Sequence, residues 1–199
     1  MKLAIVAVIA ILVVASNATV QNLLKDKEVN TQFPDNFFWN ATMPSPTGVL
    51  SDTIFRISRA NNVFSYSMTF MNTAFGKNTT ETIAYDFNRN QTYQHTTGND
   101  MCMNSTMQVT LPINVADFIN QVWNARAKVV DEREQGGHHY MTIEVNYDAQ
   151  DDLFFNMDND VLASMNGTFV GRAFNQNITT GFTEKFFSRS QMIPAACGN

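Results

Sequence analysis

The sequence predicts a mainly β protein: an antiparallel meander that forms a curved sandwich or half-barrel, with one short helix packed on the sheet. Short segments of alternating apolar and polar residues recur at intervals of roughly 8 to 14 residues, separated by turn residues. In the clearest of them, Phe64, Tyr66, Met68 and Phe70 share one face. One segment after Pro112 follows a helical period instead. About ten short strands and one helix are therefore expected.

A hairpin near the middle of the chain is the easiest element to recognise. Residues 140–147 alternate as a strand with one buried face, and residues 125–134 fit a preceding strand. Between them, Gly136 and Gly137 supply the positive φ angles of a tight turn. The other expected strands are 53–59, 64–70, 82–87, 91–97, 101–110, 153–157, 161–165, 167–174 and 182–189.

A helix of two to three turns is expected to begin after Asn114, whose side chain suits an N-cap. Asp117 falls in the first turn, where a negative charge faces the exposed amides. The apolar positions recur at helical spacing: Val115, Phe118, Ile119, Val122 and Trp123. This stripe needs an apolar partner, and the sheet is the expected one.

The chain is expected to have three parts. Residues 1–18 have the basic start and apolar run of a secretory signal peptide, and the run is shorter than the roughly 18 apolar residues of a membrane anchor. Residues 19–48 are expected to form an N-terminal arm that docks the aromatic residues of 37–39 on the domain. Residues 49–199 would form a single antiparallel β domain. The protein is thus expected to be secreted, or held in the secretory lumen, with no transmembrane segment after cleavage.

Two further features fit the secretory pathway. Acceptor sequons for N-glycosylation occur at Asn40, Asn78, Asn90, Asn104, Asn166 and Asn177. Their use would place them on surface turns or outward strand faces, although an Asn- and Thr-rich chain also produces such triplets by chance. The two cysteines, Cys102 and Cys197, favour one internal disulfide, with separate thiols or pairing to another subunit as alternatives.

The composition argues against several function classes. The net charge is −5 and basic residues are scattered, so nucleic acid is not an expected partner. Hydrolase, redox and phosphate-binding motifs are missing, and no catalytic residue is assigned. The three histidines, His95, His138 and His139, fit solvated positions better than a shared metal site. No enzyme activity and no cofactor are therefore expected.

A group of acidic residues leaves Ca²⁺ as an open alternative. Oxygen ligands on turns suit this ion, but the spacing does not match an EF-hand loop, and acidic residues in turns are common. The group comprises Asp148, Asp151, Asp152, Asp158 and Asp160. No metal site is assigned from it.

Large soft side chains are abundant: the chain has 16 Phe, 5 Tyr and 11 Met. A curled antiparallel sheet either fills its interior with such residues or leaves space for an apolar ligand. The first hypothesis is a secreted, non-enzymatic glycoprotein that binds a lipid or other hydrophobic molecule between β-sheets. The expected ligand-pocket residues are Phe64, Tyr66, Met68, Phe70, Tyr85, Phe87, Phe118 and Trp123.

The order of landmarks resembles the ependymin-related secreted glycoproteins and, more distantly, the LolA-like lipoprotein carriers. The matching features are Phe38-Trp39 followed by Gly48, Tyr85-Asp86-Phe87, Cys102 ahead of Leu111-Pro112-Ile113, and Pro194-Ala195-Ala196-Cys197. These short matches are scattered over most of the mature chain, and that family usually has more cysteines. The resemblance implies two stacked antiparallel sheets around a hydrophobic pocket, secretion, glycosylation and no enzymatic activity, and it leaves Ca²⁺ binding as an open alternative.

A second hypothesis assigns a structural role. The protein would be a subunit of an extracellular coat, matrix, filament or membrane-associated complex. It would contact protein partners through the arm at 33–46 and through exposed strand edges. An enzyme ranks third, and would need histidine or acidic side chains converging in a cleft.

Overall fold

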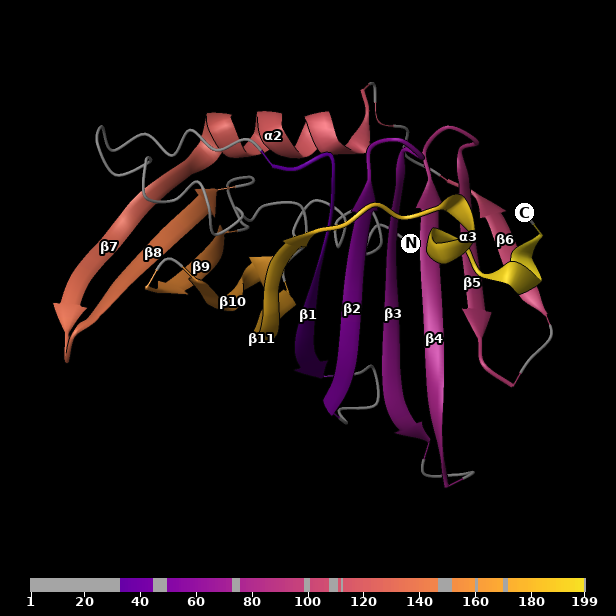
Figure 1. The fold of residues 1–199 in the computed structure, drawn as a ribbon, viewed down its shortest axis with the longest axis horizontal. Helices are drawn as coiled ribbons and strands as arrows, with labels where there is room; N and C mark the ends of the chain where they lie inside the picture. Colours follow the sequence, from indigo (N-terminus) through magenta and orange to yellow (C-terminus); the bar gives the residue numbers. More distant parts are fainter. Residues whose placement is uncertain are drawn as a thin grey trace.

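The computed structural model describes residues 33–44, 50–72, 76–98, 101–107, 111, 113–146, 152–159, 161–169 and 172–198 (Figure 1). The signal peptide expected at 1–18 lies outside this part of the chain. The elements, in chain order, are β1 (Asn36–Pro44), β2 (Leu50–Ser58), β3 (Val63–Asn72), β4 (Lys77–Asp86), β5 (Gln91–Thr96), β6 (Cys102–Thr106), α2 (Val115–Arg126), β7 (Ala127–Gln135), β8 (His138–Asn146), β9 (Asp152–Asp158), β10 (Val161–Phe169), β11 (Arg172–Glu184), α3 (Arg189–Met192) and η2 (Ala195–Cys197).

The strands form one 11-stranded antiparallel sheet in the order β6-β5-β4-β3-β2-β1-β11-β10-β9-β8-β7. The first six strands run outward from β1 as a meander, and the last five lead back to it. Strand direction changes along the sheet, so that the β7–β10 part is inclined to the β1–β5 part (Figure 1). The expected antiparallel meander with one short helix on it is confirmed. Its strands form a single continuous open sheet with β6 and β7 at the two edges.

The described part of the expected N-terminal arm has a different structure. Residues 36–44 form β1, which pairs with β2 along its whole length and with β11 on the other side. This strand joins the two meanders, so it belongs to the middle of the sheet and not to a docked arm. Within the described part of the range 33–46, the apolar side chains of Phe33, Phe37, Trp39 and Ala41 are buried in the core.

We call the face that carries α2 the inner face and the opposite face the outer face. Directly opposed residues in neighbouring strands share a face, so one row runs from Trp39 through Phe55, Tyr66 and Ile83 to Gln94. The main core lies between this face and α2. Its buried members include Phe33, Phe37, Trp39, Phe55, Phe64, Tyr85, Val115, Ile119, Trp123, Val145, Phe155, Met165 and Phe182.

Helix α2 begins where the sequence predicts. The Asn114 side chain accepts a hydrogen bond from the Ala116 amide at 3.0 Å, which satisfies one free N–H of the first turn. Asp117 pairs with Arg59 from the end of β2, with oxygen to nitrogen distances of 2.5 and 3.1 Å. Hydrogen bonding to Asp117 raises the pKa of Arg59, so the guanidinium keeps its charge. These contacts fix the helix to the sheet at its N-terminal end.

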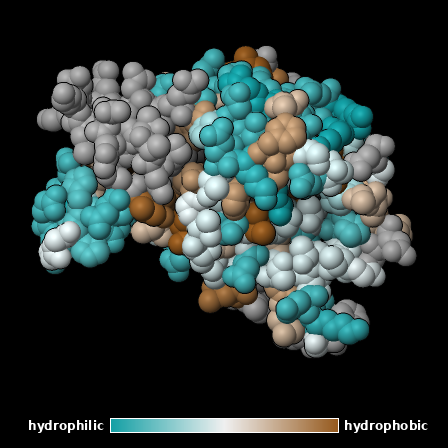
Figure 2. Space-filling view, viewed as in Figure 1, coloured by the Kyte–Doolittle hydropathy of each residue, from teal (hydrophilic) through white to brown (hydrophobic). Residues whose placement is uncertain are grey.

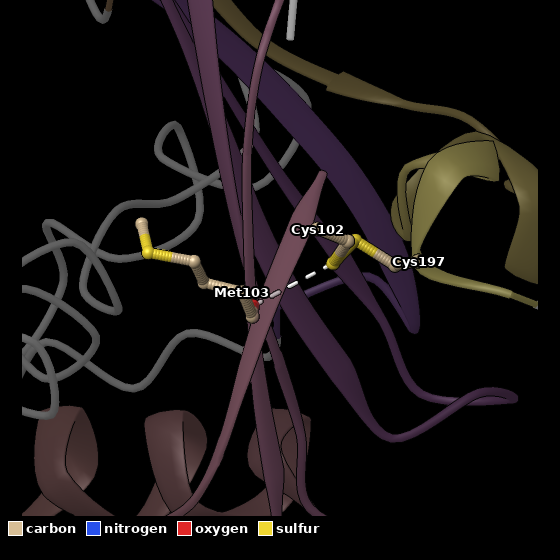
Figure 3. The surroundings of a disulfide bond; sticks show 3 residues. All are labelled: Cys102, Met103 and Cys197. Carbon is tan, nitrogen blue, oxygen red and sulfur yellow. Dashed lines mark hydrogen bonds between the residues drawn. A yellow bond between two sulfur atoms is a disulfide. The ribbon is translucent and has the colours of Figure 1, made fainter. Parts of the chain in front are cut away.

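The C-terminal segment, residues 185–198 with α3 and η2, covers the outer face of β3 to β6 (Figure 1). A second, smaller core lies beneath it, made by Val63, Ala84, Tyr93, Phe187, Met192 and Ile193. The fully buried Asp86 carboxylate is paired with the Arg189 guanidinium in the same region. Cys102 of β6 is bonded to Cys197 of η2, which confirms the expected disulfide. Figure 3 shows that this bond and the Met103 side chain lie on opposite sides of β6.

Gly167 in β10 is required by a close backbone approach. Its φ is +144°, and a Cβ at this position would lie 2.1 Å from the Asp152 carbonyl oxygen of the neighbouring strand. We expect Gly167→Ala to lower the free energy of unfolding by at least about 2 kcal/mol, because strain and a backbone clash add. Denaturant unfolding measures this. The control is Gly76→Ala at φ +61° in open space, for which about 1 kcal/mol is expected; equal losses would contradict the close approach.

Candidate functional site: the inner face

An unbroken series of aromatic rings crosses the inner face. Trp39 is stacked on Phe55 with ring centroids 4.6 Å apart, and Phe55 lies 5.9 Å from Tyr66. From there the series continues through Phe64 to Tyr85, at 6.0 and 5.8 Å. Aromatic pairs at these separations contribute beyond the apolar area that they bury. Four neighbouring strands, β1 to β4, therefore present one aromatic surface.

Helix α2 encloses one side of this surface. Trp123 of the helix contacts the rings of Phe33 and Phe155 at 5.6 and 5.7 Å. Other apolar side chains of the same cluster are only partly buried, so the apolar inner face is not entirely sealed by its packing. They are Met43, Tyr66, Ile83, Phe87, Leu111, Phe118, Val122, Ala127, Val129 and Ile178.

A first polar group lies within the aromatic surface, on β3, β4 and β5. The Tyr66 and Tyr85 hydroxyls are hydrogen-bonded to each other, and the Glu81 carboxylate lies near both. The Gln94 amide donates to Glu81 at 2.5 Å. Burial, with the charge of Glu81, raises the pKa of Tyr66 to about 12. Burial, with the Tyr66 hydroxyl, raises the pKa of Tyr85 still further. Both phenols therefore keep their protons at neutral pH and act as hydrogen-bond groups, not as bases.

The Tyr66 pKa predicts a loss of stability in alkaline solution. Between pH 10 and about 12 the folded chain keeps the Tyr66 proton and the unfolded chain loses it, so the free energy of unfolding falls as pH rises. We expect Tyr66→Phe to make the free energy of unfolding fall less steeply between pH 10 and about 12. Below pH 9 the Tyr66 hydroxyl should contribute almost no pH dependence. Urea unfolding at stepped pH measures both. An unchanged slope in Tyr66→Phe would contradict the assignment.

A second polar group lies on the inner face of β1, β2 and β11, away from the tyrosines. The Ser51 hydroxyl donates to the Met43 carbonyl at 2.9 Å and lies 3.5 Å from the Thr53 hydroxyl. Gln176 is 1% exposed, and its amide nitrogen is 3.4 Å from the Met43 sulfur. Among the described residues, its Oε1 atom has no hydrogen-bond partner. Within the same part of the chain, the ring nitrogens of Trp39 and Trp123 also lack an acceptor.

The expected ligand-pocket residues are largely brought together. Phe64, Tyr85 and Trp123 belong to the buried core cluster, and Tyr66, Phe87 and Phe118 pack against it. Met68 and Phe70 share the inner face of β3 but lie outside that cluster. The expectation did not include the inner-face residues of the presumed arm, Phe37 and Trp39, or Phe55 opposite them. Gln176 was not predicted either, because a single glutamine in a polar stretch does not indicate a pocket.

The acidic residues and the histidines lie at several separate places in the structure. Among the described residues there is no group of three or more His, Cys, Asp or Glu side chains that could hold an ion. Asp152 and Asp158 are at opposite ends of β9, about 20 Å apart along an extended strand, so the two cannot share an ion. Asp148, Asp151 and Asp160 lie outside the described residues. His138 pairs with Asp158 at 2.8 Å and His139 with Glu132 at 3.0 Å, while His95 lies on β5 opposite Cys102.

None of the six sequon asparagines lies on the inner face. By strand register, Asn40, Asn78, Asn104, Asn166 and Asn177 lie on the outer face, and Asn90 lies in the β4–β5 turn. Figure 2 views the outer face and shows mostly hydrophilic and intermediate residues over it. Asn78, Asn104, Asn166 and Asn177 are exposed, whereas Asn40 and Asn90 are half-buried with a buried Oδ1. The sheet thus separates the sequons from the aromatic series of the inner face.

A surface hollow of about 480 Å³ lies beside α2, away from these groups. It is lined by polar residues and one alanine, and it is open to solvent, so it suits an apolar ligand poorly. Its lining is Asp117, Asn120, Gln121, Asn124 and Ala125.

Fold and site together define an open antiparallel half-barrel with an aromatic inner face and a polar outer face. No family model and no curated protein sequence matches this chain. An uncharacterized conserved protein from Thermus thermophilus has a similar crystal structure, with a TM-score of 0.47 and 7% identity over 87% of this chain and 92% of that one. None of the helices in the described part of the chain has the length and apolar character needed to cross a membrane.

Proposed function

We propose that this protein is a secreted, non-enzymatic glycoprotein that binds a lipid or other hydrophobic ligand on the inner face of its sheet. The observation that carries the proposal is the unpaired Gln176 Oε1, 1% exposed, on the same face as the aromatic series from Trp39 to Tyr85. A buried acceptor without a partner costs about 1 to 3 kcal/mol. A bound molecule that brings a donor to this atom would recover that cost.

The chemistry of the face indicates an amphipathic ligand. Aromatic and methionine side chains suit an apolar chain or ring system, because they are large, polarizable and adaptable. Gln176 accepts, the Trp39 indole donates, and the protonated pair Tyr66–Tyr85 adds a further polar group beside Glu81. A ligand with a long apolar part and one or two hydroxyl, amide or amine groups matches this pattern best.

The secretory part of the proposal has separate support. A disulfide between residues 95 positions apart is typical of a chain that folds in an oxidising compartment. The exposed sequons on one face are compatible with glycans that would not obstruct the inner face. The resemblance to ependymin-related and LolA-like proteins implies the same location and ligand class.

Quenching of tryptophan fluorescence by a brominated fatty acid tests ligand binding. The chain has two tryptophans, and both lie on the inner side, Trp39 in the sheet and Trp123 in α2. We expect saturable quenching of the folded protein, retained in part by Trp39→Phe and by Trp123→Phe, because each variant leaves one reporter. Non-saturable quenching equal to that of free tryptophan would overturn the proposal.

Two matched truncations locate the binding face. Tyr66→Ala removes a half-buried ring from the inner face, and Phe38→Ala removes a half-buried ring from the outer face, where Phe38 packs on Phe187 at 6.1 Å. We expect Tyr66→Ala to weaken binding of the brominated fatty acid at least fivefold and Phe38→Ala to leave it within a factor of two. Equal effects would show that the inner face is not the binding surface.

A further inference from the structure

The two edges of the sheet are protected differently. Edge strand β7 is nine residues long, and five of them are charged: Lys128, Asp131, Glu132, Arg133 and Glu134. Edge strand β6 is shorter and reads Cys-Met-Asn-Ser-Thr, with no charged residue and no proline. Methionines at and beside it, Met103 and Met101, are 59% and 71% exposed. The β6 edge therefore lacks the charges that protect β7.

An uncharged edge strand is open to pairing with other molecules. An edge strand has a neighbour on one side only, so the N–H and C=O groups of its other side can pair with an edge strand of another molecule. Charged residues, prolines or a covering group normally prevent this. The disulfide to η2 covers part of the outer face of β6 but does not add charge to it. An uncharged edge strand without proline favours self-association.

Asn104 lies at the middle of this strand. It is exposed on the outer face, opposite Tyr93 of β5, and the triplet Asn104-Ser105-Thr106 is an N-glycosylation sequon. We infer that Asn104 carries an N-linked glycan whose role is to block pairing at the β6 edge. This inference rests on the secretory location in the proposed function. Unlike the half-buried Asn40 and Asn90, an Asn104 glycan would project into solvent without disturbing a packed neighbour.

The modification is an ordinary group transfer with a lipid-pyrophosphate-linked oligosaccharide as donor. The Asn104 Nδ2 atom forms a bond to the anomeric carbon of the first sugar and releases one of its two protons to water. The bond from that carbon to the pyrophosphate oxygen breaks, and the lipid pyrophosphate leaves with the electron pair. The attached oligosaccharide is much larger than the ~4.8 Å spacing at which a docking strand would have to lie.

Sequon variants of the full chain, expressed in a secretory eukaryotic host, test the inference. Thr106→Ala and Asn104→Gln both remove the Asn104 sequon, whereas Thr106→Ser keeps it. Thr179→Ala removes the Asn177 sequon from an interior strand and serves as a position control. Glycopeptide mass spectrometry reads occupancy, and light scattering at increasing protein concentration reads self-association.

We expect a glycan at Asn104 in the wild type and in Thr106→Ser, with both proteins monomeric at the tested concentrations. Thr106→Ala and Asn104→Gln should lose it and self-associate at least tenfold more strongly than Thr179→Ala. The inference is overturned if Asn104 is bare while Asn78 or Asn166 is modified, or if the bare variants stay as monomeric as the wild type. A chain with no glycan at any sequon contradicts the secretory location as well, which separates the two failures.

Discussion

Replacing both cysteines by serine is expected to lower the free energy of unfolding by about 4 to 5 kcal/mol. Cys102 and Cys197 are 95 positions apart, and in the chain-entropy account a loop of this length is worth that amount. The bond also fastens the C-terminal segment over the outer core of Phe187, Met192 and Ile193. Without it, this segment is retained by apolar contacts, by the pairing of Arg189 with the buried Asp86, and by the hydrogen bond that the Asn61 side chain donates to the Phe187 carbonyl.

Urea unfolding of C102S/C197S beside the wild type measures the loss, and hydrogen exchange locates it. We expect faster exchange in β6 and in residues 186–198, with β8 and β9 exchanging as before until global unfolding. Gln121→Ala on the exposed side of α2 provides a surface control, with a change below about 0.5 kcal/mol. A loss below about 1 kcal/mol in C102S/C197S would show that the C-terminal segment does not depend on the bond.

Trp39→Ala is the second large effect, with an expected loss of about 3 to 5 kcal/mol. Trp39 is 0% exposed and lies on β1, the strand that joins the two meanders. Its ring is 4.6 Å from Phe55, 5.2 Å from Phe182 and 6.2 Å from Phe37. Truncation would leave a cavity between both halves of the sheet and remove contacts to each of them.

Thermal and denaturant unfolding measure this effect. Trp39→Phe keeps a ring in the site and should lose less than half as much. Phe38→Ala, next in the chain but half-buried on the outer face, should cost about 1 to 3 kcal/mol because less apolar area is exposed. If Trp39→Ala costs no more than Phe38→Ala, β1 is not the structural centre of the sheet.

Local periodicity was enough to predict much of the fold. Helix α2 was predictable because it has one buried face, so that a 3.6-residue period survives in the sequence. Strand β3 was predictable because large apolar residues on its inner face alternate with Ser65, Ser67 and Thr69 on its outer face. Strand β1 was not recognised, because a strand covered on both sides does not alternate. Phe37 and Trp39 face the inner core, while Phe38 between them packs on Phe187 of the outer core. Pro44 is the last residue of this strand, where a proline is tolerated.

The end of the sheet was predicted less accurately. The expected strand 167–174 spans the end of β10 and the start of β11, because Gly167 was taken as a strand start and not as a residue inside one. The expected strand 182–189 extends beyond β11, which ends at Glu184. Residues 175–180 alternate little in polarity, so this part of β11 has no sequence signal, although Gln176 and Ile178 contribute to the inner face.

The candidate site was predictable where it coincided with regular aromatic alternation. Tyr85, Phe87 and Trp123 were expected on the inner face and lie there. The polar atoms that define the proposed ligand chemistry were not predictable, because they depend on which strands become neighbours. Gln176 lies beside Met43 only because β11 pairs with β1, more than a hundred positions away in the sequence.

Native mass spectrometry of the protein purified from a secretory host, after enzymatic removal of N-glycans, tests ligand binding at the inner face most directly. We predict a mass above that of the polypeptide by one amphipathic molecule. Organic extraction should release this molecule, and Tyr66→Ala should contain less of it than Phe38→Ala. A mass equal to that of the polypeptide alone, with no apolar compound in the extract of folded protein, would contradict the proposed function.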